Sequence, residues 1–336
     1  MPPDPYSVGD AGTAPSNAYL TTGSGKAVGQ REDLSDIIER IDPTECPLWA
    51  NANKTGCKAI QTDWQVQELT APDAANEQRE GFDATFGVMK PTDRLNNICQ
   101  IVAKTAAVSD TLDAVDKAGR ASETAYQKLL KGLEVRRDLE TIILGAKIRT
   151  LTDPRRMSAI QTWISNSMVG AGAGAAPVGD GSNAGTAGTA RALTEALVAD
   201  AHELAYEDGG KPTLLFMGPK LKRKFSSLAA GQAGQVATNT LQMTSARDVT
   251  VIGSVGFYLT DFGMLELIID LFQGNTWALL LDKRHIDVCN LPGRSFKSTD
   301  LAKTGSNKKF MIEWEGTLRI NAPKAHGAVK DLDASL

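Results

Sequence analysis

Residues 310–321 read FMIEWEGTLRIN, and the alternation within this stretch decides the fold class. Apolar residues stand at every second position except 316, which is a glycine, and the residues between them are mostly polar. The apolar positions are Phe310, Ile312, Trp314, Leu318 and Ile320. A period of two residues predicts a β-strand with one face in a core and the other mostly in water. Twelve residues at about 3.3 Å each span roughly 40 Å, about twice the usual strand length, so we expect a partner of similar length.

A long helix is predicted at residues 121–146, ASETAYQKLLKGLEVRRDLETIILGA. Apolar residues recur there at helical spacing: Ala125, Leu129, Leu130, Leu133, Leu139, Ile142, Ile143 and Ala146. A helix of this length spans roughly 39 Å at about 1.5 Å per residue, so helix and strand are expected to lie against each other. Gly316 lies within the apolar strand face, where we expect the missing side chain to let the helix backbone approach closely.

Composition excludes several classes of function. The chain of 336 residues is long enough for two core-forming units. With 36 basic and 40 acidic residues it offers no polycationic surface for tight nucleic-acid binding. The cysteines at positions 46, 57, 99 and 289 show no CxxC spacing and follow no secretory signal, which indicates reduced thiols in a cytoplasmic setting. No apolar run is long enough to predict a membrane span.

The N-terminal part lacks the residues for a core of its own. The first thirty residues are small and polar, which predicts a disordered tail or an arm that folds against another surface. Residues 31–41 predict a short helix. Residues 59–69 and 97–108 predict the two strands of a polar ribbon, separated by a long loop at residues 70–96. Two isolated strands are marginal in water, so this ribbon implies a partner surface, most simply another copy of the chain.

The sequence after residue 191 predicts a second, α/β unit inserted between the long helix and the long strand. One helix is expected at residues 194–207 with Leu197, Ala201 and Leu204 facing inward, and another begins at Pro219. Strands are expected at residues 213–217, 249–252, 257–260, 264–271 and 277–282. The Gly- and Ala-rich residues 170–188 are interpreted as a linker.

No motif predicts catalysis, a bound cofactor or a metal site, so we expect the protein not to be an enzyme. Residues 23–26, GSGK, lack the first glycine and the Ser or Thr of a phosphate-binding loop and are interpreted as part of a flexible arm. The histidines at 202, 285 and 326 are interpreted as surface or hydrogen-bonded residues, because their spacing does not suit a metal. Lys220, Lys222, Arg223 and Lys224 are interpreted as a solvated helix face, with a weak contact to DNA or an acidic neighbour as the alternative.

Several segments, in order along the chain, resemble a family of tailed-bacteriophage major capsid proteins. The first are residues 31–38, REDLSDII, and residues 43–48, PTECPL. The likeness continues through TDWQ at 62–65, AGRASE at 118–123, RRM at 155–157, DLAKTG at 300–305 and NAPKAHG at 321–327. Because these segments span most of the chain, chance is a poor explanation.

The resemblance implies an α+β architecture, the Hong Kong 97-type capsid fold. It implies the following parts: an N-terminal arm at 1–42, an extended β-hairpin loop with its flanks at 43–108, a peripheral domain at 109–190 that contains the spine helix 121–146, an axial α/β domain at 191–290, a return strand of the peripheral domain at 291–330 and a C-terminal tail at 331–336. No internal scaffolding domain is expected.

The function implied is that of a major capsid protein, assembling through pentamers and hexamers into the icosahedral head of a tailed double-stranded DNA phage. Candidate inter-subunit contacts are Arg31, Asp33, Asp63, Trp64, Arg79, Glu80 and Lys90. The implied partners are further copies of the chain, a portal protein at one vertex, decoration or minor capsid proteins, and packaged DNA as a weakly contacted neighbour, with no membrane. The implied location is the virion, after assembly in the host bacterial cytoplasm.

Two other functions stay open at this point. A shell protein of a cellular protein-cargo nanocompartment would share the fold, and the cargo would distinguish it from a phage head. A soluble enzyme that uses a nucleotide at residues 23–26 is the alternative from another class, and it would require Lys26 for ATP binding.

Overall fold

The computed structural model describes residues 42–84, 86–117, 119–231, 244–245, 248–249 and 256–335. Residues 41–114 and 122–336 form one compact unit, to which the rest of this description applies. The predicted arm, the helix at residues 31–41 and residues 23–26 lie outside the described residues, as does most of the predicted strand at 249–252.

The first sheet is built around β14 (Asn307–Ile320), the long strand predicted from its alternation. Along one edge β14 pairs antiparallel with β4 (Gln100–Ser109). Along its other edge it pairs with β13 (Lys297–Leu301) near its start and with β12 (Ile286–Asn290) near its end. β1 (Asn53–Gly56) adds to β12 in parallel. The hydrogen-bonded partner of the long strand is therefore β4, and the helix packs on the pair.

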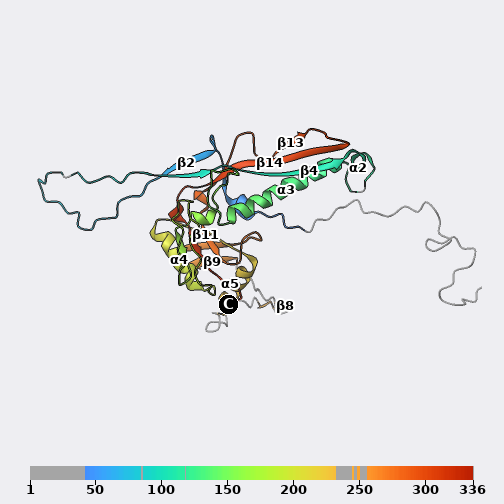
Figure 1. Cartoon of the computed structure of the whole chain (residues 1–336). Helices are drawn as coiled ribbons and strands as arrows, with labels where there is room; N and C mark the ends of the chain where they lie inside the picture. The colour runs from blue at the N-terminus through green and yellow to red at the C-terminus, as the bar shows by residue number, and fades with distance from the viewer. Residues whose placement is uncertain are drawn as a thin grey trace, which may run out of the picture. The chain divides into compact units, whose positions relative to one another are not determined.

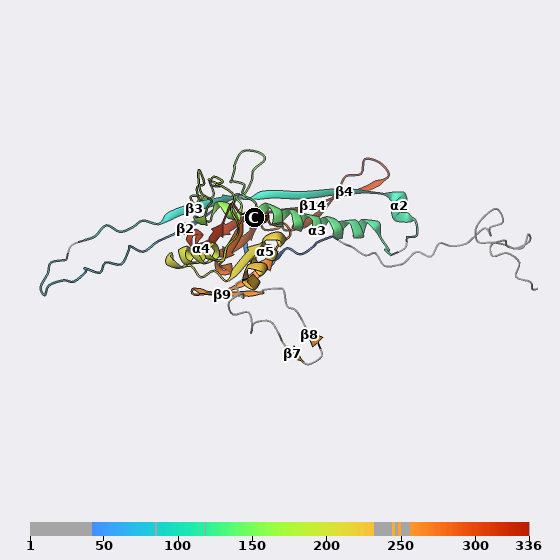
Figure 2. The same ribbon diagram turned by 90° about the horizontal axis from the view of Figure 1, so that it is seen from below.

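That helix, α3, runs from Glu123 to Leu144, two residues shorter at each end than predicted. Figures 1 and 2 both show it lying along β4 and β14, which it contacts. Val135, Leu139 and Ile143 on α3 belong to the same buried cluster as the apolar face of β14. The predicted packing of helix and strand is confirmed.

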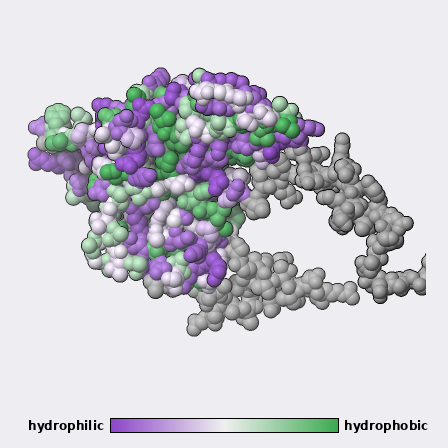
Figure 3. All heavy atoms as spheres, turned by 45° about the vertical axis from the view of Figure 1, so that its right-hand side comes forward, coloured by the Kyte–Doolittle hydropathy of each residue, from purple (hydrophilic) through white to green (hydrophobic). Residues whose placement is uncertain are grey.

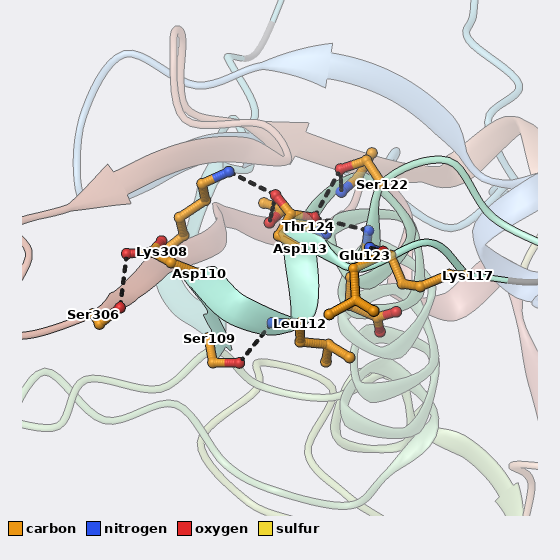
Figure 4. A network of polar contacts seen from close by, with 12 residues as sticks. Ser109, Asp110, Leu112, Asp113, Lys117, Ser122, Glu123, Thr124, Ser306 and Lys308 are labelled. Atoms are coloured by element: carbon orange, nitrogen blue, oxygen red, sulfur yellow. Dashed lines mark hydrogen bonds and ion pairs between the residues drawn. The ribbon is translucent and has the colours of Figure 1, made fainter.

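Asp113, in the short helix α2 (Asp110–Ala114), fixes the beginning of α3 (Figure 4). Its Oδ1 accepts hydrogen bonds from the backbone N–H groups of Glu123, at 3.1 Å, and Thr124, at 3.4 Å. Its Oδ2 accepts one from Lys308 Nζ of β14 at 2.6 Å. This ion pair with Lys308 lowers the pKa of Asp113 to about 2. A carboxylate at a helix N-terminus stabilises the unpaired N–H groups there, so one side chain holds α2, α3 and β14 together.

The expected role of Gly316 is wrong. A Cβ on this residue would lie 2.3 Å from the Cys289 carbonyl oxygen on β12 and 2.6 Å from Cζ2 of Trp314. The atoms that exclude a side chain therefore belong to the neighbouring strand and to the residue two positions earlier, and not to the backbone of α3. Gly316 lets the Trp314 indole lie over the strand and donate to Asn290 Oδ1 at 2.7 Å.

The expectation of a mostly solvated second face on β14 is also wrong. Glu313, Glu315 and Thr317 are buried. Arg294 forms ion pairs with both glutamates, and its distance to Glu313 is 3.2 Å. Arg155 forms a second ion pair with Glu315. Arginines that come from other parts of the chain thus replace water on this face, which a pattern of alternating residues does not reveal.

The polar ribbon consists of β2 (Gln61–Val66) and β3 (Asp93–Ile98), paired antiparallel. The predicted strand at 97–108 is in fact two strands, because β3 and β4 separate at Cys99. The buried Asn97 side chain accounts for the change of partner: its Nδ2 donates to the Leu318 carbonyl oxygen of β14 at 2.6 Å, in place of a ladder bond. The segment from residue 67 to residue 92, which we call the extended loop, connects the ribbon strands and projects away from both sheets (Figures 1 and 2).

The second sheet contains both parallel and antiparallel pairs. Its strands lie between α3 and β12 in sequence, except for the strand at residues 327–329. Its order is β5 (Asn166–Met168), β15 (Gly327–Val329), β11 (Ala278–Leu281), β6 (Leu214–Met217), β10 (Gly263–Ile269) and β9 (Phe257–Thr260). Its helices are α4 (Glu195–Glu207) and α5 (Pro219–Gly231). Shorter elements complete the described fold: α1 (Pro47–Asn51), the 3-10 helices Ile160–Thr162, Lys283–His285 and Pro323–Ala325, and the strand pair β7 (Thr244–Ser245) and β8 (Asp248–Val249).

The buried face of α4 differs from the predicted one. Val198, Ala201, His202 and Ala205 are buried, whereas Leu197 is partly buried and Leu204 is exposed. Small residues face the sheet because α4 packs closely on β15, where a Cβ on Gly327 would lie 2.6 Å from the Ala201 carbonyl oxygen. The close approach of the two backbones therefore decides which face of α4 is buried, although the larger apolar side chains lie on another face.

Residues 170–188 are not a linker. The Asp331 carboxylate accepts hydrogen bonds from the backbone N–H groups of Gly170, at 2.9 Å, and Gly188, at 2.8 Å. A Cβ on Gly188 would lie 2.2 Å from the Gly170 carbonyl oxygen. Ala175 and Thr186 also form a β-bridge. The small residues allow two backbone segments to touch, so their composition reflects packing.

Lys222 contradicts the prediction of a solvated basic face, because it is buried and its Nζ lies 3.1 Å from Ser226 Oγ. His202 and His326 are buried and hydrogen-bonded, which agrees with one of the two readings made for the histidines.

Across the described ranges no group of His, Cys, Asp and Glu could hold a metal ion, and no helix there is long and apolar enough to cross a membrane.

Replacing Gly316 with alanine should destabilise the unassembled chain by about 1–3 kcal/mol, because the Cβ must displace the β12 backbone or the Trp314 ring. Gly132→Ala is the matched control, since nothing lies within 4 Å of a Cβ at that helical position. It should stabilise the chain by about 0.5–1 kcal/mol. Urea unfolding measures both, and equal effects at the two sites would contradict the packing described for β14.

His326 should make the fold sensitive to acid. Burial lowers its pKa from 6.5 to about 3, and its Nδ1 accepts a hydrogen bond from the Asp282 N–H at 3.1 Å. The neutral ring thus contributes stability above the unfolded pKa of 6.5 that is lost as pH falls toward 3, by about 1.4 kcal/mol per pH unit. His326→Asn retains an acceptor but cannot titrate. We expect a shallower fall in unfolding free energy on acidification than in the parent chain, and parallel curves would refute this role.

Candidate subunit interfaces

The extended loop carries apolar side chains that the described chain does not cover. Phe86, Val88 and Met89 are 98%, 99% and 90% exposed, and Leu69 at the other side of the loop is 94% exposed. Apolar groups gathered in one solvated segment are costly for a chain that stays alone, and they are typical of a surface that binds another molecule. The extended loop is therefore the strongest candidate for an interface.

The root of the extended loop is held by ion pairs. Glu68 accepts hydrogen bonds from Lys324 Nζ at 2.7 Å and from Lys90 Nζ at 2.5 Å. These two ammonium groups lower the pKa of Glu68 to about 2. Lys90 ties the two sides of the loop together, and Lys324 ties them to the 3-10 helix before β15. The loop thus leaves the second sheet at a defined point.

The candidate contacts on the ribbon are occupied within the chain. Asp63 and Arg94 form an ion pair across β2 and β3 at 2.5 Å, and Arg94 lowers the pKa of Asp63. The half-buried Trp64 packs its ring against Trp163, with centroids 5.2 Å apart. Both residues therefore have structural roles in the isolated chain, and their part in subunit contacts stays a prediction.

Arg79 and Glu80 lie farther along the extended loop and are exposed. The Arg79 carbonyl oxygen accepts a hydrogen bond from the Phe82 N–H at 3.2 Å, which closes a turn there. Arg31 and Asp33 lie outside the described residues. The structure thus places Asp63, Trp64 and Lys90 at the ribbon and loop root, with Arg79 and Glu80 away from them.

Two candidate contact surfaces escaped the sequence analysis. The first is the set Phe86, Val88 and Met89, whose signal was a short apolar run, FGVM, inside an otherwise polar loop. The second is β9, where Phe257 and Leu259 are 59% and 77% exposed. Among the strands that the structure describes, β9 lies at the edge of the second sheet. On the face shown in Figure 3, in contrast, hydrophobic and hydrophilic residues are interspersed.

A buried carboxyl pair joins the parts that carry these surfaces. Glu140 of α3 accepts hydrogen bonds from the backbone N–H groups of Leu48, at 2.6 Å, and Trp49, at 2.9 Å. It also interacts with the carboxyl group of Asp270, which follows β10 and is likewise buried. Burial raises the pKa of Glu140 to about 8, so the two carboxyl groups share a proton at neutral pH. The pair links α1, α3 and the second sheet, which gives it a structural role.

Comparison with known proteins supports the family resemblance found in the sequence. The family model described as SU10 major capsid protein matches residues 16–333. The major capsid protein of Escherichia phage Phieco32 is 28% identical over 342 aligned positions, which cover 90% of this chain and 94% of that protein.

Solved structures show the fold. The capsid of cyanophage A-1(L) matches with a TM-score of 0.64 at 11% identity, over 93% of this chain and 98% of that one. The SrpI encapsulin of Synechococcus elongatus PCC 7942 matches with a TM-score of 0.53 at 9% identity, over 91% and 94%. The expected α+β, Hong Kong 97-type capsid fold is confirmed. Since the family model covers nearly the whole sequence, the chain belongs to the SU10 major capsid protein family.

Proposed function

We propose that this phage major capsid protein assembles through pentamers and hexamers into the icosahedral head of a tailed phage, around double-stranded DNA. The observation that carries the assembly mechanism is the extended loop, whose apolar residues 86, 88 and 89 have no cover within the described chain. Lying across a neighbouring subunit would bury them, and apolar burial favours association by about 25 cal/mol per Å². Each copy gives a loop to one neighbour and receives one from another.

The parts of the chain take the following roles in this proposal. Residues 1–42 form an arm, 43–108 the extended loop and its flanks, 109–190 the peripheral domain with the spine helix, 191–290 the axial domain, 291–330 the return strand and 331–336 a tail. The axial domain lies at the centre of each pentamer and hexamer, where the exposed side chains of β9 would meet the next copy. Ion pairs at the loop root would keep the loop directed toward its neighbour.

Packaged DNA is a weakly held neighbour in this proposal, because the chain carries a net charge of −4. A portal protein at one vertex and decoration or minor capsid proteins are further partners, and the head assembles in the host bacterial cytoplasm. The protein acts by assembly, and we propose no enzymatic role. The encapsulin likeness makes a cargo shell the competing proposal, and nucleic acid rather than a cargo protein inside isolated particles would decide against it.

Electron microscopy of the expressed chain tests the proposal directly. We expect closed shells, or the pentameric and hexameric rings from which shells are built. Monomers alone, over a wide range of concentration and salt, would refute it.

Replacing Phe86, Val88 and Met89 with serine should raise the concentration needed for assembly by at least about tenfold, since 1.4 kcal/mol per subunit suffices for that factor. The unfolding free energy of the unassembled chain should barely change, because these side chains are already exposed. Light scattering against protein concentration gives the first quantity and urea unfolding the second.

Gln78→Ser in the same loop is the control, because its side chain is exposed and polar. It should leave the assembly threshold unchanged. If the triple variant assembled at the parent concentration, the extended loop would not be the dominant contact.

A further inference from the structure

Two cysteine side chains meet at the base of the β2–β3 ribbon, the end that lies away from the extended loop. Cys57 follows β1 and Cys99 lies between β3 and β4, and their Sγ atoms are 3.5 Å apart in one hydrogen bond. Both are free thiols, 2% and 0% exposed. Such a pair, 42 positions apart in sequence, is a constructed contact between two segments and differs from an isolated buried cysteine.

The backbone holds both residues in place. The Cys57 N–H donates to the Asn290 carbonyl oxygen of β12 at 3.0 Å, and the Cys99 N–H donates to the Ile60 carbonyl oxygen at 2.7 Å. A disulfide bond is about 2.05 Å long, so the sulfur atoms need to approach by roughly 1.5 Å.

A third thiol lies nearby but is held apart from the reaction. Cys289 belongs to the same small cluster, and its Sγ lies 3.0 Å from Thr55 Oγ1. The Cys57 Sγ contacts the carbonyl oxygen of Cys289, at 3.7 Å, and not its sulfur. Cys99, which directly contacts the Cys57 sulfur, is therefore the favoured partner.

We propose that Cys57 and Cys99 form an oxidation site that closes to a disulfide and links the two segments at the base of the β2–β3 ribbon. The co-reactant is a small disulfide of the glutathione class. The Cys57 thiolate attacks one sulfur of the small disulfide, which releases one thiolate and leaves a mixed disulfide on Cys57. Cys99 then loses its proton to solvent, attacks the Cys57 sulfur and releases the second small thiolate. Two protein thiols are oxidised and one small disulfide is reduced.

The electrostatics assign the order of these steps. The hydrogen bond from Cys99 lowers the pKa of Cys57 to about 7, and the same bond raises the pKa of Cys99. Cys57 is thus the first thiol to ionise and the attacking group. Residues 58–61 beside it are exposed, so a local opening of this short turn would admit a small oxidant without unfolding the ribbon.

The bond would enclose β2, the whole extended loop and β3 in one covalent ring. In a reducing cytoplasm the thiols stay free while the chain folds and assembles, and oxidation outside the cell then fixes the base of the ribbon. This timing rests on the proposed function as a capsid protein, whereas the bond itself can be tested on the unassembled chain.

The test incubates the folded, unassembled chain with oxidised glutathione, alkylates the remaining thiols and maps disulfides by mass spectrometry of a non-reduced digest. We expect a peptide pair linked through positions 57 and 99 and the loss of two alkylatable thiols, reversed by dithiothreitol. Cys289→Ser should still form the link. Cys57→Ser and Cys99→Ser should not form it, and circular dichroism checks that they fold.

A 57–289 or 99–289 link in the parent chain would overturn the assignment of the pair, and so would a persistent mixed disulfide with glutathione. Retention of all four alkylatable thiols in the parent chain would overturn the proposal itself, whatever the variants do. Failure to form shells would leave this result unaffected, so the two proposals can fail separately. If shells do form, oxidation should raise their melting midpoint by several degrees in the parent and not in Cys99→Ser.

Discussion

The fold depends on one antiparallel ladder, in which residues 307–316 of β14 pair with residues 100–109 of β4. This ladder joins segments about two hundred positions apart, so the chain between them must leave the first sheet and come back to it. The entropy of closing so long an excursion grows only slowly with its length, and a continuous ladder with α3 packed on it can offset that cost. The second sheet can therefore be large without disturbing the first. β12, the strand by which the chain returns, pairs with the far end of β14.

The two sheets need a joint, and the buried pair of Glu140 and Asp270 supplies it. Two adjacent N–H groups, at Leu48 and Trp49, require acceptors in a region without water, and the Glu140 carboxyl group provides both oxygens. A fully charged pair of carboxylates would repel in this setting. Sharing one proton keeps the amide hydrogen bonds and removes most of the repulsion, which the raised pKa of Glu140 reflects. A glutamine could satisfy one N–H through its oxygen but would present donors to the other.

Sequence patterns predicted the elements well and their surroundings poorly. The alternation in β14 and the helical spacing in α3 each report one face of one element, and both elements were found where expected. The second face of β14 is buried by Arg155 and Arg294, which no local pattern connects with Glu313 and Glu315. Glycines were misinterpreted for the same reason: at 170, 188 and 316 they mark places where backbones or rings from elsewhere come close. The candidate contacts were sought in the loop that carries the uncovered apolar residues, but attention to charged residues hid the FGVM run.

The extended loop combines a rigid root with an uncovered end, and this contrast has an energetic meaning. Glu68 with its two lysines and Trp64 against Trp163 fix where the loop leaves the sheets, so little orientational entropy remains to be lost there on binding. Residues 86–89 gain most from burial and lie where the described part of the chain offers no partner. In the proposed shell each loop contact is heterologous, because the loop of one copy meets a different surface of the next. Such contacts end in a closed ring only if the rotation between copies is fixed. A rigid root is therefore what allows a long loop to define a closed shell instead of an open chain of subunits.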